Sequence, residues 1–133
     1  MKETYAGSCH CGAVRFESEL NLLEGTTRCN CSICAKTRYW AAVATPDAFR
    51  LLQGADALTD YQLGGDTIHH RFCSRCSVKP FGRGTAAELG GDFYAVNVAC
   101  LDDATDEELA EAPVTYVDGR HDRESSPAET RHL

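Results

Sequence analysis

Short apolar runs, separated by glycine and proline, recur along most of this chain and are typical of short β-strands. Residues 3–18 indicate two strands, with Gly12 in the turn before the second. Apolar, aromatic and β-branched residues predict further strands at residues 39–44, 49–52, 58–63, 67–72, 93–99 and 114–117. We expect residues 93–99 to be buried and residues 114–117 to form an edge strand.

Turn and cap signals divide these strands. The sequence Gly-Gly-Asp occurs at residues 64–66 and again at residues 90–92, and this composition favours hairpin turns. Thr105 and Glu108 have the spacing of a helix capping box, and Pro113 ends the short helix that they predict. The pattern predicts a mainly β protein, with a single domain over residues 1–120 and a loosely held polar tail over residues 121–133.

Charge and composition narrow the classes of partner. The 133 residues carry a formal charge of −7, and no basic run is present that would attract a nucleic acid or an anionic membrane. No apolar run approaches the roughly 20 residues of a membrane-spanning helix, and the N-terminus has no signal-peptide pattern. We therefore expect a cytoplasmic protein. Disulfides are disfavoured in the cytosol, so the eight cysteines favour metal binding or reactivity.

Three of the cysteines lie within six residues, at Cys29, Cys31 and Cys34. Alternation along an extended backbone would direct Cys29 and Cys31 to one side, and a turn over Ser32 and Ile33 would bring Cys34 to them. Three thiolates suit zinc, which prefers four ligands in a tetrahedron. The spacing therefore indicates a catalytic zinc site with one open position.

The two remaining cysteine pairs favour a second zinc ion. A CxC pair, Cys9 and Cys11, and a CxxC pair, Cys73 and Cys76, together supply four thiolates, which is the ligand set of a closed structural zinc site. The sequence thus predicts two zinc ions per chain, one structural and one at the open site.

Other interpretations of the three-cysteine cluster remain open on the residues alone. A fourth protein ligand would close it into a second structural site, and the candidates are His10, His69, His70 and Cys100. It could also hold an iron–sulfur cluster or act as a redox switch of free thiols. If the site is open, three thiolates and Zn²⁺ leave a net charge of −1, which makes a substrate thiol a better fourth ligand than water. That favours chemistry at a carbon–sulfur bond.

Four segments resemble the glutathione-dependent formaldehyde-activating enzyme family, which includes the centromere protein V type: residues 8–14, 29–34, 72–76 and 97–102. The resemblance runs from about residue 5 to Arg120. It implies an Mss4-like β-tent of short antiparallel sheets with zinc sites and one short C-terminal helix. One position departs from the family pattern, because Ser77 stands after the second cysteine pair where the family usually has glycine.

The resemblance also implies roles for the cysteines. Cys9, Cys11, Cys73 and Cys76 match the family's structural zinc ligands, and Cys29, Cys31 and Cys34 match the open zinc site associated with activity. The implied enzyme is a carbon–sulfur lyase that forms S-hydroxymethylglutathione from glutathione and formaldehyde. The alternative is a non-catalytic zinc-binding interaction module with two structural metals. The oligomeric state is left open.

Several residues near the cysteines have two interpretations. The cations that follow the clusters either bind the carboxylates of glutathione or form a solvated face; they are Lys36, Arg38, Lys79 and Arg83. Tyr39 and Trp40 line a substrate pocket or pack in the core, and Asn97 donates to a substrate or to the backbone. His69 and His70 are expected on opposite faces of one strand. Cys100 is expected to be a buried free thiol.

Overall fold

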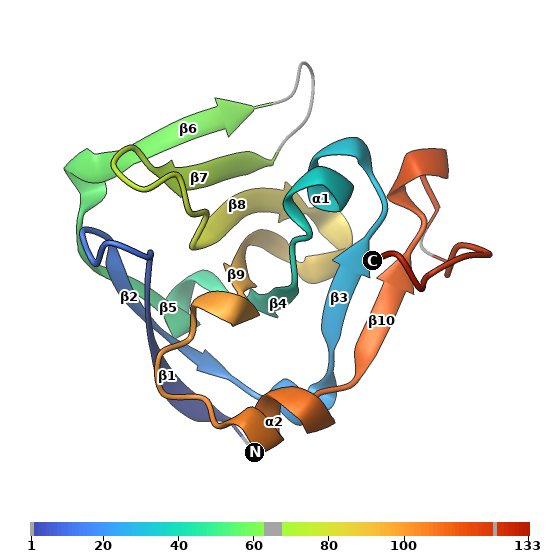
Figure 1. The fold of residues 1–133 in the computed structure, drawn as a ribbon, viewed down its shortest axis with the longest axis horizontal. Coiled ribbons are helices and arrows are strands. Elements are labelled where there is room, and N and C mark those ends of the chain that lie inside the picture. The colour runs from blue at the N-terminus through green and yellow to red at the C-terminus, as the bar shows by residue number, and fades with distance from the viewer. Residues whose placement is uncertain (1, 63–67, 124) are drawn as a thin grey trace.

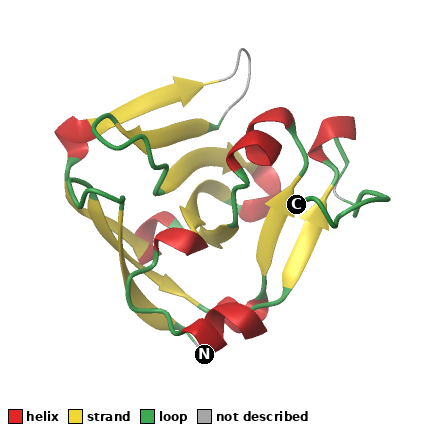
Figure 2. Ribbon diagram, in the orientation of Figure 1, coloured by secondary structure: helices red, strands yellow, loops and turns green. Residues whose placement is uncertain are grey.

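The computed structural model describes residues 2–62, 68–123 and 125–133, and the strands in these ranges form two sheets (Figures 1 and 2). The smaller sheet has the order β1-β2-β5 and is antiparallel, with β1 at Glu3–Ser8, β2 at Arg15–Leu20 and β5 at Phe49–Gln53. The larger sheet has the order β10-β3-β4-β9-β8-β7-β6. Its strands are β3 (Thr26–Cys29), β4 (Ala41–Ala44), β6 (Leu58–Gln62), β7 (His69–Cys73), β8 (Phe81–Ala86), β9 (Gly91–Asn97) and β10 (Val114–Val117).

Two short α-helices connect parts of the larger sheet, α1 at Ser32–Thr37 and α2 at Asp106–Glu111. The capping box at the start of α2 is confirmed, because Thr105 Oγ1 accepts the N–H of Glu108 and the Glu108 carboxylate accepts the N–H of Thr105. Short 3₁₀ turns link many of the strands. None of the helices in the described part of the chain has the length and apolarity needed to cross a membrane.

Aromatic side chains from both sheets form the centre of the core. Phe16 and Phe49 come from the smaller sheet, and Phe81 and Tyr94 come from the larger one. The ring of Phe49 is stacked on Tyr94 at 4.1 Å between centroids and on Phe16 at 5.4 Å, and its centroid lies 4.8 Å from that of Phe81. Burying four large rings at one point gives the two sheets a strong reason to pack face to face.

The mainly β prediction is confirmed, and most of the predicted strands occur within one or two residues of their expected positions. The expected buried strand at 93–99 is corrected, because β9 ends at Asn97 and most of its residues are only half-buried. Residues 98–100 form a 3₁₀ turn in which the Asn97 side chain caps the N–H of Ala99. The predicted hairpin turn at residues 64–66 lies outside the described residues.

Three elements were not predicted: β3, β8 and α1. β3 consists of Thr-Thr-Arg-Cys, which has no apolar alternation, and β8 contains two glycines. The expected single helix is therefore one of two. The expectation of antiparallel pairing also needs a correction, because β10 runs parallel to β3, with Val117 opposite Cys29 (Figure 1).

The position that departs from the family pattern has an unusual backbone conformation. Ser77 has φ +67°, in the left-handed region, and its N–H donates to the carbonyl of Cys73 at 2.8 Å. A side chain in this region costs about 1–2 kcal/mol, which glycine avoids. We expect Ser77→Gly to raise the stability by roughly 0.5–1 kcal/mol, seen as a higher melting temperature.

The matched control is Ser74→Gly, in the same turn but at a residue without a positive φ. There glycine only adds freedom to the unfolded chain, so the melting temperature should fall. A lower melting temperature for Ser77→Gly than for Ser74→Gly would contradict this account.

Candidate metal centre

Four cysteines from two separate turns converge on one point. Cys9 and Cys11 lie in the turn between β1 and β2, while Cys73 ends β7 and Cys76 follows in the next turn. The sulfur of Cys11 lies 3.7 Å from that of Cys9 and 3.6 Å from that of Cys73, and all four sulfurs lie within 4.8 Å of one another. A tetrahedron of sulfurs about 2.3 Å from a zinc ion has edges of about 3.8 Å. The cluster therefore fits a metal ion with four sulfur ligands.

Backbone amides direct their N–H groups at these sulfurs. The N–H of Val14 donates to Cys9 Sγ at 3.3 Å, and the N–H of Arg75 donates to Cys73 Sγ at 3.4 Å. Burial alone would raise the pKa of Cys76, but donation from the backbone N–H groups of Val78 and Cys11 lowers that pKa to about 6. These donors favour the thiolate form that a metal requires. The segment from Cys9 to Cys11 is a turn.

The other three cysteines converge where β3 passes into α1. Cys29 is the last residue of β3, Cys31 is the N-cap of α1, and Cys34 lies in the first turn of that helix. Their sulfurs lie within 4.8 Å of one another, and all three residues are half-buried. The three sulfurs converge as predicted, and the turn over Ser32 and Ile33 that brings Cys34 to them is the first turn of α1.

The pKa values of the three thiols are shifted in different directions. Donation from the Cys31 and Cys34 thiols lowers the pKa of Cys29, and the backbone N–H groups of Cys31 and Gly119 donate to it as well. Sharing a site with Cys29 raises the pKa of Cys31 and of Cys34. Negative charge in the metal-free cluster therefore lies mainly on Cys29, the sulfur with the most donors.

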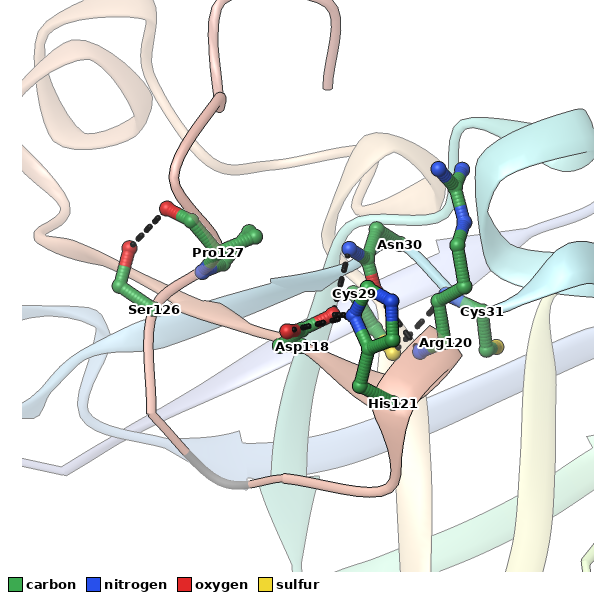
Figure 3. A network of polar contacts seen from close by, with 8 residues as sticks. All are labelled: Cys29, Asn30, Cys31, Asp118, Arg120, His121, Ser126 and Pro127. Atoms are coloured by element: carbon green, nitrogen blue, oxygen red, sulfur yellow. Dashed lines mark hydrogen bonds and ion pairs between the residues drawn. The ribbon is translucent and has the colours of Figure 1, made fainter.

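A polar network beside this cluster was not predicted from the sequence (Figure 3). Asn30 Nδ2 donates to Asp118 Oδ1 at 2.9 Å, and Asn30 Oδ1 accepts the N–H of Arg120 at 2.9 Å. His121 Nδ1 lies 2.9 Å from Asp118 Oδ2. Asn30 and Asp118 are buried, and donation from Asn30, followed by His121, lowers the pKa of Asp118. The network ties the segment after β10 to the residue between Cys29 and Cys31.

Gly119 is the point of closest approach between that segment and the cysteines. A Cβ atom built on Gly119 would lie 2.4 Å from Cys29 Sγ and 3.1 Å from Cys31 Cβ. Only glycine leaves room for the sulfur there, and its N–H is one of the donors to Cys29. The segment Asp118–His121 therefore covers one side of the three-cysteine cluster.

Residues 4–118, which contain both clusters, match the family profile described as "Glutathione-dependent formaldehyde-activating enzyme" (GFA). The chain belongs to the GFA family. A Halomonas elongata protein named "Putative glutathione-dependent formaldehyde-activating enzyme" is 40% identical over 79 residues, which are 53% of this chain and 50% of that protein. The matched region thus spans half the length of this curated relative.

A crystal structure of a Rhodobacter sphaeroides protein has the same fold as this GFA family member. The two chains are 38% identical, with a TM-score of 0.69, and the match covers 83% of this chain and all but 1% of the other. The mainly β architecture expected from the sequence is therefore shared with a solved structure.

The proposed fourth ligands lie elsewhere in this GFA domain. Within the described residues, no histidine and no further cysteine joins the three-cysteine cluster. His69 is half-exposed and pairs with Asp60 at 2.9 Å, whereas His70 is buried, so the two histidines face opposite sides of β7 as predicted. Cys100 is buried, and burial raises the pKa of its thiol to about 12, as expected of a buried free thiol.

The neighbouring cations and aromatic residues separate into different environments. Lys36 and Arg38 are exposed, and Arg83 is exposed and pairs with Asp92 at 3.1 Å. Tyr39 is buried with its hydroxyl donating to the carbonyl of Ala95, and Trp40 packs against the core with Nε1 donating to Thr26 Oγ1. Asn97 donates to the carbonyl of Lys79 at 2.9 Å. Of the four cations, Lys79 alone is half-buried.

The fit of Gly119 against Cys29 gives a direct test. Gly119→Ala places a methyl group on Cys29 Sγ, so the sulfur or the covering segment must shift. We expect the affinity for cobalt(II) at the three-cysteine cluster to fall at least about tenfold, measured from the absorbance of the sulfur–cobalt bonds. The four-cysteine cluster of the same molecule is the internal control and should keep its affinity. If Gly119→Ala binds cobalt(II) at the three-cysteine cluster as tightly as wild type does, the close fit of Gly119 against Cys29 is contradicted.

Proposed function

We propose that this chain is a zinc-dependent carbon–sulfur lyase-type enzyme that acts on a small thiol adduct. Glutathione and formaldehyde, which give S-hydroxymethylglutathione, are the leading substrates. The observation that carries the proposal is the contrast between the two clusters. One offers four sulfurs, and the other offers three with no further cysteine or histidine beside them among the described residues. Family membership supports the same reaction class.

In this proposal the chain binds two zinc ions with different tasks. Cys9, Cys11, Cys73 and Cys76 hold a structural ion that joins the β1–β2 turn to the end of β7. Cys29, Cys31 and Cys34 hold the second ion and leave a position for the sulfur of the substrate. We expect this chemistry in the reducing cytoplasm, where free thiols persist.

The reaction needs no oxidant or reductant. The substrate thiol gives its proton to solvent, and its sulfur lone pair forms a bond to the carbonyl carbon of the aldehyde. The π electron pair of the carbonyl moves to oxygen, which takes a proton from solvent, so protons balance. Zinc in the open site would supply the lowered thiol pKa and a fixed sulfur position. The chain contributes orientation, because β3, α1 and the covering segment Asp118–His121 fix the three cysteines.

Zinc content separates the two clusters. Protein purified without added metal should hold two zinc ions per chain by elemental analysis. Cys29→Ser should lose one and remain folded, whereas Cys73→Ser should unfold, because a structural zinc ion contributes roughly 10–16 kcal/mol of apparent binding energy in small domains. Cys100→Ser is the matched control and should keep both ions. A wild-type chain with one zinc ion, or unfolding of both ligand variants, would favour an interaction module with structural metals only.

The reaction itself is best measured where the uncatalysed addition is slow. At about pH 6 little of a free thiol is ionised, so spontaneous addition of glutathione to formaldehyde is slowed. We expect the wild-type protein to speed the exchange between glutathione and S-hydroxymethylglutathione in NMR exchange spectra. Cys29→Ser should lose this acceleration and Cys100→Ser should keep it. Equal exchange rates with wild type and Cys29→Ser would remove the support for catalysis at this cluster.

A further inference from the structure

Asn30 uses both ends of its side-chain amide on one short segment (Figure 3). It is buried, and it lies between two members of the three-cysteine cluster. Its Nδ2 donates to Asp118 Oδ1, and its Oδ1 accepts the N–H of Arg120, both at 2.9 Å. Its backbone N–H donates to the carbonyl of Val117 at 3.2 Å. This single residue therefore makes three hydrogen bonds to the chain around the end of β10.

These bonds begin where the pairing of the strands ends. The parallel ladder between β10 and β3 has its last partners at Val117 and Cys29. An asparagine amide offers one acceptor and a donor group, as a peptide unit does, so it can continue such a pairing beyond the last strand residue. The side chain of Asn30 thus extends the contact between the two strands into the segment Asp118–His121.

Gly119 lies between the two residues that the Asn30 side chain holds. A Cβ built on Gly119 would lie 2.4 Å from Cys29 Sγ, so the backbone of Gly119 is packed directly against that sulfur. The segment is also bonded within itself, because the Asp118 carbonyl accepts the N–H of His121 at 3.2 Å. Hydrogen bonds from Asn30 therefore position a compact turn, and with it the backbone that touches Cys29.

We propose that Asn30 is a positioning residue of the three-cysteine site, which holds the Gly119 backbone against Cys29 and so fixes the site on that side. An apolar residue in its place would leave the Asp118 carboxylate and the Arg120 N–H without this partner. Groups that orient metal ligands from behind typically change metal affinity about 10–100-fold when they are lost. The benefit for a bound substrate thiol rests on the proposed function, whereas the effect on metal binding does not.

The test compares zinc affinity at the two clusters by competition with chelators, with bound zinc counted by native mass spectrometry. Asn30→Ala removes both side-chain hydrogen bonds. We expect zinc affinity at the three-cysteine cluster to fall about 10–100-fold and that of the four-cysteine cluster to stay within about twofold. Cys29→Ser, which retains only the four-cysteine site, assigns the two affinities. Unchanged affinity at the three-cysteine cluster would overturn the proposal, and so would an equal loss at both clusters.

An exchange of the two side chains separates hydrogen bonding from packing. Asn30→Asp keeps the size of the side chain but turns a carboxylate towards Asp118, so zinc should bind the three-cysteine cluster more weakly than in wild type. Adding Asp118→Asn returns a donor opposite an acceptor and leaves an oxygen for the Arg120 N–H. The double variant should recover most of the lost affinity. A double variant that binds zinc no better than Asn30→Asp would overturn the assigned role.

The matched control is Asn97→Ala, which also removes an amide with two hydrogen bonds. Asn97 donates to the carbonyl of Lys79 at 2.9 Å and accepts the N–H of Ala99 at 3.1 Å. Zinc affinity at the three-cysteine cluster should stay within about twofold of wild type in this variant, and a loss equal to that of Asn30→Ala would contradict the proposal. None of these outcomes depends on turnover. Failure of wild type to speed glutathione exchange would instead count against the proposed function.

Discussion

The convergence of four sulfurs from two turns is the constraint on which the rest of the molecule depends. Cys9 and Cys11 belong to the turn that joins two strands of the smaller sheet, and Cys73 and Cys76 lie at the end of a strand of the larger one. A metal ion held by these four sulfurs would join the two sheets, which also meet at the rings of Phe49 and Tyr94. The position of β7 and of the loop after it, which carries Lys79, follows from that link.

The two cysteine clusters differ in what surrounds them as well as in ligand number. Backbone N–H groups donate to sulfurs in both clusters, so these donors do not distinguish the two sites. The three-cysteine cluster has a buried polar network beside it, in which Asn30 donates to Asp118. A buried carboxylate whose pKa is lowered by its hydrogen bonds, as at Asp118, is common at functional sites.

The sequence alone predicted the mainly β architecture and the grouping of seven cysteines, because cysteine spacing and turn residues are local signals. It did not predict β3, whose residues have no apolar alternation, or α1, whose first residues were interpreted as a simple turn. The network of Asn30 with Asp118 was also missed, since it depends on the parallel pairing of β10 with β3 across almost 90 residues. The signal that could have indicated it was Asp118-Gly119, placed directly after the last predicted strand.

The three cysteines and the covering segment Asp118–His121 are far apart along the chain, and this separation affects the order in which the site forms during synthesis. The ligands of the four-cysteine cluster all lie within the first 76 residues, so that cluster can close while the rest of the chain is still being synthesised. The three-cysteine cluster has its own sulfurs by residue 34, but Asp118 and Gly119 are added more than 80 residues later. One side of this cluster therefore stays uncovered until the covering segment Asp118–His121 has been made.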